Sequence, residues 1–159
     1  MPIIDISKLT PRTGSIYPEP YASEMAGRSS LRLGDAGGLT QFGANLVTLQ
    51  PGAKSSLRHW HLHEDEFVMV TAGECVLVQD AGESTMRAGD CAAFKAGDPD
   101  GHHFINRTAT VAQFLVIGTR APREVATYSD VDLMVVLEPG EKGGAQFTYK
   151  DGTPWVGPR

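Results

Sequence analysis

Glycine and proline residues divide this chain into short apolar segments, and this pattern constrains the fold more than any other feature. The 159 residues include 18 glycines and 10 prolines, and turn-forming groups separate runs of strand length. Short apolar runs bounded by such turns predict an all-β fold. The expected strands cover 39–50, 56–61, 66–71, 75–79, 84–87, 91–95, 102–106, 111–119, 131–137 and 146–149. Helical character is weak and restricted to 21–28 and 122–128.

The bulk properties exclude several classes of protein. The length favours one domain, and a net charge of −5 argues against a nucleic-acid-binding surface, which needs a local excess of Lys and Arg. No apolar stretch approaches the roughly 20 residues that span a bilayer, and the first residues do not resemble a signal peptide. We therefore expect a cytoplasmic protein with no membrane or nucleic-acid partner. Cys75 and Cys91 are too few for a disulfide scaffold and are expected to be small buried thiols.

The histidines indicate a metal site. All five lie in two clusters, which are His59, His61 and His63, and His102 and His103. Glu66 follows the first cluster, and imidazole and carboxylate together are ligands for several transition metals. Residues i and i+2 of a strand point to the same face, so His59 and His61 can both point into a barrel. One metal site built from distant strands is the simplest interpretation.

Two separated segments carry a resemblance to a known family. The first reads Pro51-Gly52…His59-x-His61-x4-Glu66-x6-Gly73, and the second reads Gly89-Asp90-x4-Lys95…His102-x3-Asn106. In this order they resemble the two motifs of the cupin superfamily, over about residues 45–120. The resemblance implies a double-stranded β-helix, also called a jelly-roll or cupin barrel. It also implies one divalent transition metal per chain (Fe, Mn, Ni or Zn), with four ligands: His59, His61, Glu66 and His102.

Two alternatives in the ligand set stay open. The loop before His102 is longer than is usual in the family, which leaves a choice between His102 and His103; His102 keeps the spacing to Asn106. His63 continues the same-face series and would become a ligand if the strand register slipped by two residues. An octahedral ion with four protein ligands keeps two positions open for a small-molecule ligand. No catalytic residue is assigned, because nothing places Glu64 or Asp65 beside a substrate.

The chain is expected to have three parts. Residues 1–38 form an N-terminal arm, 39–120 the barrel, and 121–159 a C-terminal extension with short strands. Open sheets need their edges covered, so we expect the arm and the extension to do this, partly across a homodimer. Six apolar residues are expected in the core and the barrel lining, namely Phe67, Met69, Leu77, Phe94, Phe104 and Phe114.

The sequence favours a metal-dependent enzyme acting on a small hydroxy or carbonyl compound, with dioxygenase-type or isomerase-type chemistry. One alternative is a non-catalytic cupin that binds a sugar or another small molecule. Another is a sugar-phosphate isomerase, which needs a basic cluster in its pocket, and the sequence reveals no convincing one. Arg58 is interpreted as a surface residue, while Gln113, Arg120 and Lys95 could reach a ligand but are not placed in the barrel.

Overall fold

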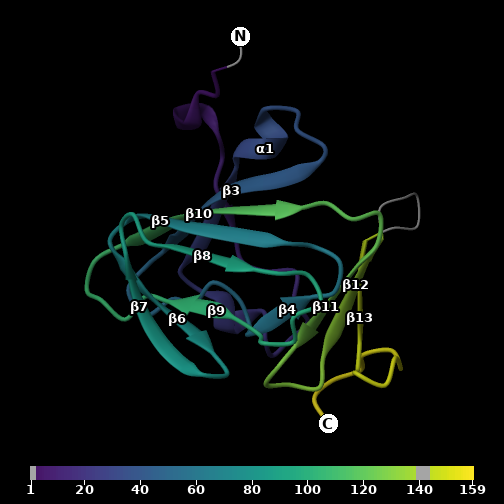
Figure 1. Ribbon diagram of the computed structural model, residues 1–159. Helices are drawn as coiled ribbons and strands as arrows, with labels where there is room; N and C mark the ends of the chain where they lie inside the picture. Colours follow the sequence, from purple (N-terminus) through teal and green to yellow (C-terminus); the bar gives the residue numbers. More distant parts are fainter. Residues whose placement is uncertain (1–2, 139–143) are drawn as a thin grey trace.

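The structure is a computed structural model that describes residues 3–138 and 144–159 (Figure 1). Its largest sheet has the order β1-β2-β3-β10-β5-β8. These strands are β1 (Arg12–Thr13), β2 (Arg28–Arg32), β3 (Phe42–Leu49), β10 (Ala112–Thr119), β5 (Glu66–Ala72) and β8 (Cys91–Phe94). The expected all-β, jelly-roll fold is confirmed.

Two smaller sheets complete the architecture. One has the order β13-β12-β11-β4, and the other β7-β6-β9. Their strands are β13 (Gly144–Thr148), β12 (Met134–Glu138), β11 (Glu124–Tyr128), β4 (His59–His61), β7 (Gly82–Arg87), β6 (Glu74–Gln79) and β9 (His103–Ile105). The helical elements are α1 (Leu33–Ala36) and two 3₁₀ turns, η1 (Ile6–Lys8) and η2 (Ser23–Met25). In the described residues, no helix has the length and apolar character needed to cross a membrane.

The two segments with weak helical character are not α-helices. Residues 122–128 contain β11, which pairs with β12 on one side and with β4 on the other. Its Glu-Val-Ala-Thr-Tyr sequence includes β-branched and aromatic residues that favour a strand. In residues 21–28, only the short 3₁₀ turn η2 forms before β2 begins.

The apolar core has two clusters. The first lies in the barrel between the largest sheet and the β7-β6-β9 sheet, and includes Val47, Leu49, Val68, Val70, Cys75, Leu77, Phe104 and Phe114, with Phe94 packed against it. The second lies against the β13-β12-β11-β4 sheet, and includes Met25, Leu57, Ala126, Tyr128, Leu133 and Val135. The four residues Leu77, Phe94, Phe104 and Phe114 are therefore in or against the core, as expected.

The expectation that Phe67 and Met69 are core residues is wrong. Their side chains are 40% and 37% exposed, while Val68 and Val70 between and after them are fully buried. Side chains alternate along a strand, and β5 begins with Glu66, which lines a cavity on the inner side of the sheet. The even-numbered residues therefore face inward and the odd-numbered ones face outward.

The expectation that Cys91 is a buried thiol is also wrong. Cys75 is buried as expected, but Cys91 is exposed. The register of β5 with β8 pairs Cys91 with Met69, so both lie on the outer face of the largest sheet. The same pleat therefore explains why both residues are exposed.

Candidate metal centre and its cavity

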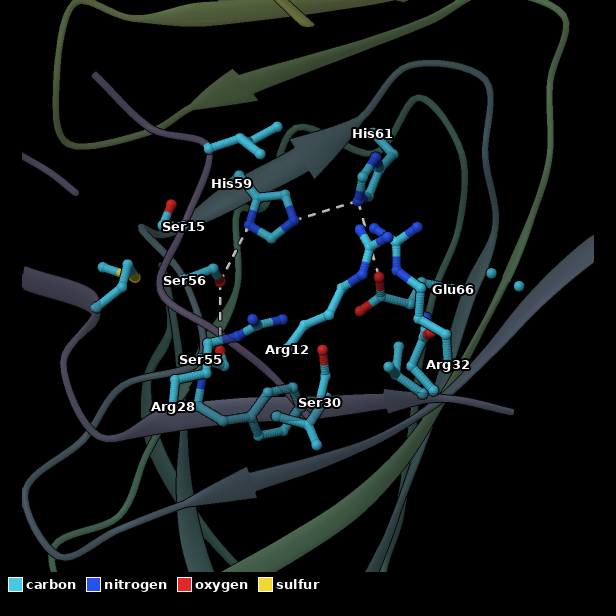
Figure 2. A pocket seen from close by; sticks show the side chains of 18 of the residues that line it. Arg12, Ser15, Arg28, Ser30, Arg32, Ser55, Ser56, His59, His61 and Glu66 are labelled. Atoms are coloured by element: carbon cyan, nitrogen blue, oxygen red, sulfur yellow. Dashed lines mark hydrogen bonds and ion pairs between the residues drawn. The ribbon is translucent and has the colours of Figure 1, made fainter. Parts of the chain in front are cut away.

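The first two candidate ligands lie on β4. This strand pairs with β11, in a register that sets His59 opposite Tyr128 and His61 opposite Ala126. Because the two histidines are two residues apart, the pleat directs both rings to the same side. Their Nε2 atoms are 3.1 Å apart and the ring planes are nearly perpendicular, at 83° (Figure 2).

Glu66 and His102 complete the cluster from two other strands. Glu66 is the first residue of β5, and His102, just before β9, is linked to His59 by an isolated β-bridge. The His102 side chain is 2% exposed and its ring stacks on Phe94, with 3.5 Å between ring centroids. Its Nε2 atom is 3.1 Å from Glu66 Oε1, while Glu66 Oε2 is 3.7 Å from His61 Nε2. The four residues that the sequence singles out are thus brought together.

The spacing of the His59, His61 and Glu66 ligand atoms fits a single divalent ion, and His102 lies beside this group. Two nitrogens that bind one ion at right angles, each at about 2.1 Å, are about 3.0 Å apart. The Nε2 atoms of His59 and His61 are 3.1 Å apart, as are His102 Nε2 and Glu66 Oε1. Ligand atoms of His59, His61 and Glu66 all lie within 4.8 Å of one another. Imidazole nitrogen with carboxylate oxygen is a donor set suited to Fe, Mn, Ni or Zn.

The protonation of His59 also suits a ligand. Its Nδ1 lies 2.9 Å from the Leu57 carbonyl, which can accept a hydrogen bond from it. Burial, reinforced by the nearby His61 and His102 rings, lowers the pKa of His59 to about 3. The ring is therefore neutral near pH 7, with its proton on Nδ1 and the Nε2 lone pair directed into the cluster.

Glu66 supplies the negative charge of the cluster. Burial by itself would raise its pKa, but the contact with His102 and the proximity of His59 and His61 outweigh burial, so the pKa is lowered. An ionised carboxylate supplies the negative charge that a divalent cation needs for charge compensation.

Glu124 is a further residue of the site that the sequence analysis missed. It is 1% exposed, at the start of β11, and its two oxygens accept hydrogen bonds from the backbone N–H groups of Leu62 (2.7 Å) and His63 (3.0 Å). Oε1 is also 3.7 Å from His61 Nδ1, an electrostatic contact longer than a hydrogen bond. Burial would lower the pKa of His61, but the carboxylates of Glu124, Glu66 and Glu64 outweigh it and raise the pKa.

The remaining two histidines lie outside this cluster. β4 ends at His61, and His63 has a side chain that is 45% exposed, with Nδ1 3.9 Å from Glu124 Oε2. His103 points away from the cluster, because it alternates with His102, and its Nδ1 is 3.1 Å from the Ser56 carbonyl. The structure therefore gives His102 and not His103 the position beside Glu66.

The candidate ligands line a cavity of about 620 Å³ that is also lined by four arginines, namely Arg12, Arg28, Arg32 and Arg120. The expectation that the pocket lacks a basic cluster is therefore wrong. Arg28 and Arg32 lie on one strand, but Arg12 and Arg120 come from distant segments, so no local run of charge signals the cluster. Arg12, Arg28 and Arg32 reach the cavity because β1 and β2 extend the largest sheet beside β3, and Arg120 directly follows β10, the next strand of that sheet.

Three other polar residues, Arg58, Gln113 and Lys95, do not line this cavity. Arg58 forms ion pairs with Asp130 and Asp80. Gln113 donates a hydrogen bond to Thr48 Oγ1. Lys95 lines a second, smaller cavity of about 120 Å³.

Comparison with known proteins identifies the family. A family model described as a cupin domain matches residues 45–118. A crystal structure of a sugar phosphate isomerase of the cupin superfamily from Silicibacter pomeroyi is 59% identical, with a TM-score of 0.93; the match covers 98% of this chain and 97% of that one. The chain belongs to the cupin superfamily.

More distant structures share the fold. A provisionally assigned sugar phosphate isomerase from Acidithiobacillus ferrooxidans is 26% identical over 81% of this chain and 80% of that one, with a TM-score of 0.72. A predicted oxalate decarboxylase from Thermotoga maritima is 22% identical over 75% of this chain and 99% of that one, with a TM-score of 0.60, which indicates the fold alone. Among curated proteins, none matches this chain.

Proposed function

We propose that this protein is a metal-dependent isomerase that acts on a phosphorylated sugar. The observation that carries the proposal is that the His/Glu cluster and several arginines line one cavity. A divalent ion can coordinate the carbonyl and hydroxyl oxygens of a sugar, and guanidinium groups can form charged hydrogen bonds to a phosphate. The similarity to a sugar phosphate isomerase at 59% identity supports the same reading. Sugar-phosphate isomerisation is therefore favoured over dioxygenase-type chemistry.

The size and lining of the cavity agree with such a substrate. Its volume of about 620 Å³ is within the range of about 300–1,000 Å³ that is usual for small-molecule sites. An ion held by His59, His61, Glu66 and His102 would supply a Lewis acid that polarises the carbonyl oxygen of the open-chain sugar. The phosphate end of the same molecule would lie toward the arginines.

An aldose–ketose interconversion moves one carbon-bound proton between C2 and C1, while a hydroxyl proton moves between the two oxygens. A side chain must carry the carbon-bound proton. Glu64 lines the cavity beside the candidate ligands, and its Oε1 accepts a hydrogen bond from the Ala121 N–H at 2.8 Å, which fixes the side chain. Asp35, which also lines the cavity, is engaged with Arg120. We therefore assign the proton transfer to Glu64.

The test is turnover on a panel of aldose and ketose phosphates, followed by NMR in D₂O after loading with Fe(II), Mn(II), Ni(II) or Zn(II). We expect interconversion of one pair with deuterium incorporated at the exchanging carbon. The Glu64→Gln variant should keep its metal and lose about 10²–10⁴-fold in kcat. The His59→Ala/His61→Ala variant should lose both metal and turnover. Metal-loaded protein that binds these sugars and converts none would refute the isomerase and leave a binding cupin.

A further inference from the structure

We infer that the first two strands form a phosphate-binding site, in which Arg12, Arg28 and Arg32 surround Ser30 on the wall of the cavity. The identification of the ligand as the phosphate of a sugar rests on the proposed function. The site itself, a receptor for a phosphate dianion, is argued from the strand pairing and the charges alone. It would explain why the N-terminal segment is built into the sheet.

The strand register brings the three arginines around one residue. Arg28, Ser30 and Arg32 alternate along β2 and therefore point to the same face. β1 pairs with β2 so that Arg12 lies directly opposite Ser30. Ser30 thus has one arginine across the ladder, at about 5 Å between Cα atoms, and one on either side along its own strand, at about 7 Å. The backbone thus places three arginines within one or two residue positions of Ser30 on one face of the sheet.

This face of β2 turns into the barrel. In the pairing of β2 with β3, Arg28 is opposite Leu49 and Ser30 is opposite Val47. Leu49 and Val47 are both buried in the barrel core. In Figure 2, the side chains of Arg12 and Arg32 extend from this wall toward the side that bears His61 and Glu66. A ligand bound here would therefore reach toward the candidate metal centre.

The charges on this wall are mostly without carboxylate partners in the described residues. Within the described residues, no carboxylate lies within ion-pair distance of Arg12 or Arg28, and Arg32 reaches only Asp35, at 3.4 Å. Arg120, in contrast, pairs with Asp35 and donates to the Leu39 carbonyl at 2.9 Å. Of the four arginines of the cavity, the three on β1 and β2 are thus the ones available for a ligand.

Arg28 gives the most specific sign of an absent acceptor. Its Nε atom is buried and has no hydrogen-bond partner in the described structure. Burial lowers the pKa of Arg28, and the neighbouring positive charge of Arg32 acts in the same direction. A buried donor without an acceptor is costly. A phosphate offers several anionic acceptors that match the guanidinium fork, and would relieve both the missing hydrogen bond and the repulsion.

The inference is tested by titrating inorganic phosphate into the metal-loaded full chain, measured by calorimetry and by thermal unfolding. The test variant is Arg28→Met/Arg32→Met, and the control is Arg107→Met. Arg107 is an exposed residue that pairs with Glu83 on β7. All forms keep the His/Glu cluster, so any contact of phosphate with the metal is common to them.

We expect phosphate to raise the unfolding temperature of the wild type and of the control, and to bind the double variant at least ten times more weakly. If the double variant does not fold, the Arg12→Met variant replaces it, because Arg12 is exposed and its replacement should not disturb folding. This variant should still bind phosphate severalfold more weakly. Equal phosphate affinity in all folded variants, or no phosphate binding by the wild type, would overturn the inference.

This design separates the inference from the proposed function. Phosphate binding that depends on the arginines, without turnover of any sugar phosphate, would refute the isomerase and leave the anion site intact. Turnover with a KM that is unchanged in the double variant would support the isomerase and refute this site.

Discussion

Replacement of Glu124 by glutamine tests how the site is held together. The Glu124 carboxylate accepts two backbone N–H bonds from the segment that follows β4, and its Oε1 faces His61. Glutamine has nearly the same shape but only one acceptor oxygen. The NH2 group of its amide would therefore face a backbone N–H, and neither donor would have an acceptor. The negative charge beside His61 would also be lost.

The magnitude follows from these contacts. One buried N–H without an acceptor should lower the free energy of unfolding by about 1–3 kcal/mol. Loss of a carboxylate that is hydrogen-bonded to a ligating imidazole typically lowers metal affinity about 10–100-fold. Because Glu124 contacts His61 only electrostatically, at 3.7 Å, we expect the lower end of that range, about 10-fold, which corresponds to about 1.4 kcal/mol. The Glu124→Gln variant should therefore be less stable without metal, and should gain less stability when metal is added.

Urea unfolding with and without metal, together with competition against a chromophoric chelator, measures both quantities. The control is Glu138→Gln on the adjacent strand β12, because Glu138 pairs with Arg123 and has a half-exposed side chain. Equal metal affinity of the two variants would refute the role of Glu124 in orienting His61. If the Glu124→Gln variant loses stability but keeps its metal affinity, the role of Glu124 is only to accept the backbone hydrogen bonds of the segment after β4.

Two further predictions concern the fold and the assembly. Gly73 has a φ of +70° and a Cβ there would lie 2.5 Å from the Val111 carbonyl oxygen, whereas Gly52 has a φ of +81° with open space. Both alanine variants carry the strain of a left-handed backbone, about 1–3 kcal/mol, so Gly73→Ala should be the less stable in urea unfolding; equal losses would contradict the clash. We also propose, from the need to cover the open sheet edges, that the N-terminal arm and the C-terminal extension pack partly across a homodimer. Light scattering should then give a dimer for the wild type, and a monomeric wild type would contradict the proposal.

Much of the metal centre could be predicted from the sequence, because strand geometry converts spacing into direction. The two-residue step from His59 to His61 places both rings on one face, and the two motifs bring Glu66 and His102 to them. The same alternation applies along β5. If Glu66 points inward, then Phe67 and Met69 must point outward, so their exposure was available from the sequence.

The rest of the site depends on pairings between distant segments. Arg12 and Ser30 become neighbours only through the register of β1 with β2, and nothing in the local sequence fixes that register. Glu124 is outside both motifs. The one signal for it in the sequence is the strand-forming composition of residues 124–128, because a strand there can pair with β4 and bring Glu124 close to His61. The division into arm, barrel and extension at residues 38 and 120 stays a prediction.

The most direct test of the account is the metal content of protein purified without a histidine tag or chelator, compared with the His59→Ala/His61→Ala variant. Elemental analysis should find about one transition metal per chain in the wild type and almost none in the variant, with both proteins folded. Wild-type protein that contains no metal, even after reconstitution, or a variant that retains it, would contradict the assignment of this cluster as the metal centre.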